Sequence, residues 1–183
     1  MNIRAMTRVA LMAAVMAIAA QIAIPLPFSP VPFTLQVLGV ILSGLLLGPR
    51  YGALAQIIYL LVGAVGVPVF AQFSGGVGSL VGPSGGYLLS YPFAAALAGL
   101  AAGAAANSPR GRALAVSVLW GIAALVVIYT LGATQLAIVT QLPASVAVAQ
   151  GVLPFVAFDL VKVGLAAAVA TAAAPAIATT SRA

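Results

Sequence analysis

Residues 156–170, near the C-terminal end of the chain, read VAFDLVKVGLAAAVA. This stretch places Asp159 and Lys162 inside a run of residues that is otherwise apolar. Asp159 is the one acidic residue of the sequence, and Lys162 is the one lysine. Ionisable residues are costly inside a membrane-spanning segment, so they usually face a cavity and carry function there.

The composition of the 183-residue chain is that of an integral membrane protein. Charged residues make up 4% of it and hydrophobic residues 64%, whereas soluble domains carry roughly 25% charged residues. The absence of cysteine and histidine, with a single carboxylate, argues against a disulfide, a catalytic triad or a metal site. Without a Walker A motif we expect no ATPase activity, and we expect neither an enzyme nor a bound cofactor.

Six apolar segments approach the ~20 residues that a helix needs to cross the hydrocarbon layer. They cover about residues 5–24, 33–48, 52–70, 86–106, 113–136 and 151–178. Segments rich in Pro and Gly connect them, such as PLPFSPVP after the first and GPRYG after the second. The sequence therefore predicts an all-α integral membrane protein with six transmembrane helices, forming a single transmembrane domain over 1–183.

The arginines predict the topology of these spans. With six spans, every arginine falls on the same side of the membrane, and the positive-inside rule places both termini in the cytoplasm. These residues are Arg4, Arg8, Arg50, Arg110, Arg112 and Arg182. Their scattered placement also favours a membrane protein over a nucleic-acid-binding one. An alternative is that the N-terminal segment is a signal peptide, whose cleavage would leave five spans.

Asp159 and Lys162 stand three residues apart, so they share one face of a helix and can neutralise each other. One interpretation is a structural pair that fixes the last span to its neighbours. We favour a ligand site in a cavity that opens outward, because intramembrane charges are usually functional. A carboxylate and an ammonium suit a small polar metabolite with N–H and C=O groups better than a metal ion.

Two further segments are candidates for the same site. The first is SGGVGSLVGPSGGYLLSYP, residues 74–92, in which glycines let the backbone approach a ligand or let the loop act as a lid. A plain flexible loop is the alternative. The second holds Thr34 and Gln36 at the start of the second span, where Thr34 could equally be a helix cap. The first span also carries small residues four apart, which allow close helix packing: Ala10, Ala13, Ala14 and Ala17.

Four motifs in this order resemble the BioY family, the biotin-specific S components of energy-coupling factor (ECF) transporters. They are PVPFTLQ after the prolines of the first connection, GVPVF at 66–70, GPSGGYL at 82–88, and the Asp159–Lys162 pair. Ser84 departs from the threonine that is usual in the family, but it keeps the hydroxyl. The resemblance implies a biotin-binding cavity that is covered by the first and third connections. It also implies partners, namely a T component and two ATPase subunits, in a bacterial cytoplasmic membrane.

Residue roles follow from the resemblance. It implies that Asp159, Lys162 and Tyr87 line the vitamin site, with Asp159 accepting ureido N–H bonds and Lys162 donating to the ureido oxygen. The opposite arrangement, in which Lys162 meets the valerate carboxylate, stays open. We expect these residues to be joined in the ligand site by Thr34, Gln36, Gly82, Ser84, Gly85 and Gly86. The alanines of the first span are expected to dock the T component, although the pair that does so is ambiguous.

Two other functions remain as alternatives. One is a solitary proton-coupled carrier of a small ureido or amide metabolite, in which Asp159 would be the protonation site. The other is a membrane assembly factor with a purely structural pair.

Overall fold

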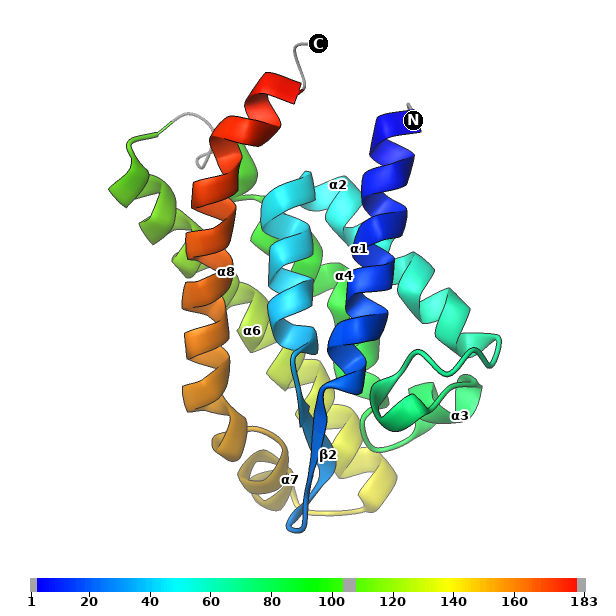
Figure 1. Ribbon diagram of the computed structural model, residues 1–183. Coiled ribbons are helices and arrows are strands. Elements are labelled where there is room, and N and C mark those ends of the chain that lie inside the picture. Colours follow the sequence, from blue (N-terminus) through cyan, green and yellow to red (C-terminus); the bar gives the residue numbers. More distant parts are fainter. Residues whose placement is uncertain (1–2, 104–107, 181–183) are drawn as a thin grey trace.

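The computed structural model describes residues 3–103 and 108–180, with side chains placed up to residue 174 (Figure 1). Arg182 and the predicted end of the fourth span, residues 104–106, lie outside the described residues. The main elements are α1 (Ile3–Gln21), β1 (Ala23–Leu26), β2 (Ser29–Thr34), α2 (Gln36–Ala64), α3 (Val77–Val81), α4 (Gly85–Gly99), α6 (Arg110–Thr140), α7 (Ala144–Gly151) and α8 (Leu153–Thr180). A short 3₁₀ turn, Ala71–Phe73, precedes α3.

Four helices in the described part of the chain are long and apolar enough to cross a membrane: α1, α2, α6 and the Leu153–Ala174 part of α8. The fourth predicted span appears as α4, whose 15 residues are fewer than a full crossing needs. Most of the second and third predicted spans lies within α2, but residues 33–34 belong to β2 and residues 65–70 follow the helix.

A sharp break divides α2 at the predicted GPRYG boundary. Gly48 adopts φ 77° and ψ 176°, which is not helical, and Pro49 follows it. In a straight helix, residues 43 and 56 would be about 20 Å apart along the axis. Instead, Gln56 Nε2 donates to Ser43 Oγ at 2.9 Å. The chain therefore folds back on itself, so the two parts of α2 are neighbouring helical segments.

A β-hairpin forms the proline-rich segment after the first span, where the sequence predicted only a connection between two helices. Ala23 pairs with Thr34 and Leu26 with Ser29 in an antiparallel ribbon, with an irregularity in register at Pro25. Proline cannot donate to a sheet ladder, yet it is tolerated because both strands of a two-stranded ribbon are edge strands. The all-α expectation therefore needs this correction.

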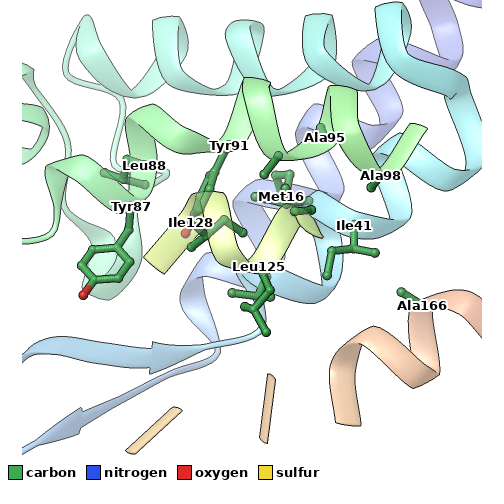
Figure 2. Packing of buried hydrophobic residues seen from close by; sticks show 14 of the residues in the cluster. Met16, Ile41, Tyr87, Leu88, Tyr91, Ala95, Ala98, Leu125, Ile128 and Ala166 are labelled. Atoms are coloured by element: carbon green, nitrogen blue, oxygen red, sulfur yellow. The ribbon is translucent and has the colours of Figure 1, made fainter. Parts of the chain in front are cut away.

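The core is built from small residues that bring helices close together. Ala94, Ala95 and Ala98 of α4 are fully buried. A Cβ on Gly44 of α2 would overlap the backbone of α4, so only glycine permits this approach. Figure 2 shows larger side chains that join this cluster from other helices: Met16 from α1, Ile41 from α2, Leu125 and Ile128 from α6.

The two ends of the molecule differ in character. The start of α1, the break in α2, the start of α6 and the end of α8 lie at one end in Figure 1. The described arginines belong to these segments. The opposite end holds the β-hairpin, α3 and α7, and it carries no arginine or lysine among the residues that form those three elements.

Candidate ligand-binding site

A cavity of about 310 Å³ lies beneath the hairpin and the glycine-rich loop. Its walls come from β2, from residues 70–84, and from α2, α4, α6, α7 and α8. Of the residues predicted for the ligand site, seven line it: Thr34, Gln36, Gly82, Ser84, Tyr87, Asp159 and Lys162. These come from three distant parts of the sequence, and the fold gathers them around one cavity.

The two charged side chains form an ion pair in the wall of this cavity. Lys162 Nζ lies 2.7 Å from Asp159 Oδ1, and the residues are only 5% and 3% exposed, respectively. The helical i, i+3 spacing brings them together, as the sequence predicts. Burying an unpaired charge is costly, and the mutual pairing of the two side chains offsets part of that cost.

Lys162 contacts three protein groups. Its ammonium donates to the carbonyl oxygen of Thr34 at 2.6 Å as well as to Asp159. It also lies 3.9 Å from the centre of the Phe33 ring, in a cation–π contact. The two hydrogen bonds use two of the three N–H donors of the ammonium, so at most one donor is left for a ligand unless a hydrogen bond is given up.

Asp159, in contrast, retains acceptor capacity. Its Oδ2 accepts a hydrogen bond of 2.7 Å from the hydroxyl of Tyr129 on α6, and its Oδ1 accepts from Lys162. A carboxylate offers about four lone-pair positions, so two donors leave room for further N–H groups. Among the charged groups of the described chain, Asp159 is thus the better candidate for direct contact with a ligand.

Thr34 and Gln36 belong to a hydrogen-bonded series that supports the cavity wall. The Thr34 hydroxyl donates to Gln36 Oε1 and accepts from the Gln36 backbone N–H, both at 3.2 Å. Gln36 Nε2 then donates to the Tyr59 hydroxyl at 2.8 Å, which in turn donates to the Val69 carbonyl at 3.0 Å. Thr34 therefore satisfies the first N–H of α2 and also lines the cavity, although the N-cap position belongs to Leu35 and not to Thr34.

Side chains from two helices hold the glycine-rich loop against the body of the protein. Gln21 at the end of α1 donates to the Phe70 carbonyl at 3.2 Å and accepts from the Phe73 N–H at 3.0 Å. Gln135 on α6 donates to the carbonyls of Leu80 and Gly82, at 2.8 and 3.0 Å. The loop therefore has a defined position over the cavity.

The residues around the start of α4 divide into two groups. Ser84 lies at the N-cap without making a side-chain capping bond, so its hydroxyl remains available to the cavity. Tyr87 lines the cavity, but its hydroxyl donates to the Gly151 carbonyl at 2.8 Å. Gly85 and Gly86 were predicted in the ligand site. Instead they serve packing, since a Cβ on either would overlap backbone of Leu80 or Leu131.

The alanines of α1 point in two directions. Ala13 and Ala17 are partly buried and pack against the core. Ala10 and Ala14 are exposed, next to the exposed apolar side chains of Leu11, Val15 and Ile18. The structure thus separates the two small-residue pairs that the sequence left equivalent.

Sequence reasoning did not single out Tyr129 or Phe33, the two aromatic partners of the ion pair. A tyrosine in the middle of an apolar span was a usable signal for Tyr129, because a buried hydroxyl needs a partner. No such signal marked Phe33, because its position over Lys162 depends on the β-hairpin, which the sequence did not predict.

These features define a class of protein: a mainly helical integral membrane protein with a cavity that is lined by a buried carboxylate–ammonium pair. The model of the BioY family matches residues 1–179. The chain belongs to the BioY family.

Relatives and a solved structure agree with this assignment. The chain is 41% identical over 170 residues to a probable biotin transporter BioY from Pyrococcus horikoshii, covering 93% of this chain and 96% of that protein. It is 44% identical over 147 residues to the biotin transporter BioY of Thermotoga maritima, covering 80% and 83% of the two chains. The crystal structure of the S-component for biotin from an ECF-type ABC transporter superposes with a TM-score of 0.82. That structure is 28% identical and covers 92% of this chain and 89% of its own.

Proposed function

We propose that the chain captures biotin at the cavity and serves as the substrate-binding S component of an ECF-type transporter. The observation that carries this proposal is Asp159, a buried carboxylate that is held by Lys162 and Tyr129 and keeps unused acceptor positions in the cavity wall. Biotin presents ureido N–H donors that suit such an acceptor. The choice of biotin as the ligand is supported by the names of the relatives and of the structural neighbour.

In the proposed complex Asp159 accepts a ureido N–H while it stays paired with Lys162. Lys162 has at most one N–H donor left for the ureido oxygen, because the other two bond to Thr34 and Asp159. The valerate tail then extends toward the loop around Gly82 and Ser84, where the free hydroxyl at the start of α4 can donate to its carboxylate.

The proposed topology has six spans with both termini in the cytoplasm. It is supported by the break that divides α2 and by the position of the described arginines, which belong to segments at one end of the molecule. The cavity lies beneath the hairpin at the opposite end. In this topology the cavity opens on the external side of the cytoplasmic membrane, and an external vitamin can reach it there.

Transport then requires partners, since the sequence has no nucleotide-binding motif. We propose a T component and two ATPase subunits, with the T component docking on the exposed face of α1 that carries Ala10 and Ala14. Small residues at this position let a partner helix approach closely. The proton-coupled carrier considered above is not favoured by the names of the relatives.

The proposal is tested by equilibrium binding of labelled biotin to the purified, detergent-solubilised chain alone. We expect saturable one-to-one binding that unlabelled biotin displaces and that thiamine and riboflavin leave intact. A folded sample that binds no biotin, or that exchanges it equally for the other vitamins, would contradict the function.

A further inference from the structure

Tyr129 reaches the ion pair from a different helix. Its hydroxyl, on α6, donates to Asp159 Oδ2 at 2.7 Å, whereas Lys162, on α8 itself, takes Oδ1 at 2.7 Å. Tyr129 also lines the cavity next to the carboxylate that it contacts. The two oxygens of Asp159 are therefore held by two donors that belong to separate helices.

This arrangement fixes the plane of the carboxylate. A carboxylate bound at one oxygen can still rotate, because the terminal torsion of aspartate has a broad energy profile. Donors on both oxygens remove that freedom and direct the remaining lone pairs along set directions. A ligand donor then meets an acceptor that needs no reorganisation on binding, which raises affinity by lowering the entropy that binding costs.

We propose that Tyr129 is a positioning residue that sets Asp159 as the acceptor for a ureido N–H and thereby selects ligands that carry this donor. The inference rests on the proposed function, because it takes the ureido ring as the group that meets Asp159. It goes beyond that function by assigning the geometry of recognition to a residue on α6. Tyr129 acts through Asp159 and not through a ligand contact of its own.

A purely structural role for Tyr129 would have a different consequence. If the hydroxyl only tied α6 to α8, its loss would weaken all ligands of the cavity by the same factor. If it positions Asp159, its loss weakens only those ligands whose N–H meets the carboxylate. The ratio of the affinity for biotin to the affinity for an analogue without the N–H therefore separates these roles. It does so even where a loss of stability also lowers both affinities.

The test compares Tyr129→Phe with the wild-type chain in binding to biotin and to two analogues, each methylated at one ureido nitrogen. Methylation removes one N–H donor, and its steric effect is shared by both proteins. For the nitrogen that faces Asp159, we expect the wild type to prefer biotin strongly. In Tyr129→Phe that preference should fall by about tenfold or more, the scale expected when a hydrogen bond to a charged group is lost.

Tyr51→Phe is the matched control, because Tyr51 is 39% exposed and is not among the residues that line the cavity. It should retain the wild-type preference, and melting temperatures of all samples establish that they are folded. The inference is overturned if Tyr129→Phe weakens biotin and both analogues equally, or if it weakens none of them. It is also overturned if the wild type binds biotin without discriminating against either analogue. A wild-type chain that binds no biotin would instead overturn the proposed function.

Discussion

Lys162 on α8 donates a hydrogen bond of 2.6 Å to the backbone carbonyl of Thr34, the last residue of β2. The same ammonium neutralises Asp159 at 2.7 Å. One side chain therefore joins the charged pair of the site to the hairpin that covers it. The hairpin cannot leave its position without removing a partner from a buried cation, and this relationship links the cover of the cavity to its chemistry.

Lys162→Met should destabilise the protein more than the double substitution Asp159→Asn with Lys162→Met. The single change leaves the carboxylate without its cation, and breaking a buried pair in this way costs about 3–5 kcal/mol. The double change removes both charges and should recover part of that loss. Melting temperatures of the two variants in the same detergent measure the difference, and equal melting temperatures would argue against a tightly coupled pair.

Tyr59→Phe should accelerate the release of biotin. Tyr59 does not line the cavity, but its hydroxyl connects Gln36 beside the hairpin to the Val69 carbonyl of the covering loop. Loss of about 1 kcal/mol from one hydrogen bond corresponds to roughly fivefold faster dissociation if it acts on the closed state alone.

A chase of labelled biotin with excess unlabelled vitamin measures this rate. Tyr51→Phe, on the exposed side of α2, again serves as the control and should release biotin at the wild-type rate. Unchanged dissociation in Tyr59→Phe would mean that the series of hydrogen bonds does not hold the loop.

Tyr87→Phe should affect stability more than ligand recognition. The Tyr87 hydroxyl is buried and donates to the Gly151 carbonyl at 2.8 Å, so its removal leaves that carbonyl unsatisfied. Such a loss costs about 1–3 kcal/mol of folding free energy. We expect a lower melting temperature and a smaller loss of affinity than in Asp159→Asn. Normal stability with abolished binding would instead place the hydroxyl on the ligand.

Ala14→Leu should impair transport but leave biotin binding intact. Ala14 is exposed on α1, so a larger side chain there fills the face that we assign to the T component. Ala13→Leu is the matched control, because Ala13 packs against the core and its enlargement should reduce stability. Biotin uptake by cells with a complete transporter, compared with binding by each purified variant, distinguishes these effects. Wild-type uptake by Ala14→Leu would exclude this face as the docking surface.

The sequence was sufficient for the charged pair and for the broad architecture, and the reason is energetic. Charges inside an apolar helix are too costly to occur without a partner, so each of Asp159 and Lys162 indicated the other as its partner in an ion pair. Pro and Gly marked the connections, including the break at Gly48 and Pro49. These signals are local, and local signals can be read from a single chain.

The remaining features depend on contacts between distant segments. Lys162 bonds to the backbone carbonyl of Thr34. Because every residue has a backbone carbonyl, the type of residue at 34 could not indicate this contact. No strand was predicted in the proline-rich connection, although a ribbon made of two edge strands accepts proline at 25 and 32. Gly85 and Gly86 looked like a ligand loop, and their packing role became visible only with α6 in place.

Whether the buried Asp159–Lys162 pair forms the biotin site is best tested by replacing both charged residues with neutral ones and measuring biotin binding. Calorimetric titration of biotin into the Asp159→Asn, Lys162→Met double variant would be compared with the wild type, with melting temperatures taken for both. We expect a folded variant that has lost measurable biotin binding, while the wild type binds one equivalent. A folded variant that binds biotin as tightly as the wild type would contradict this expectation and leave the pair a structural role alone.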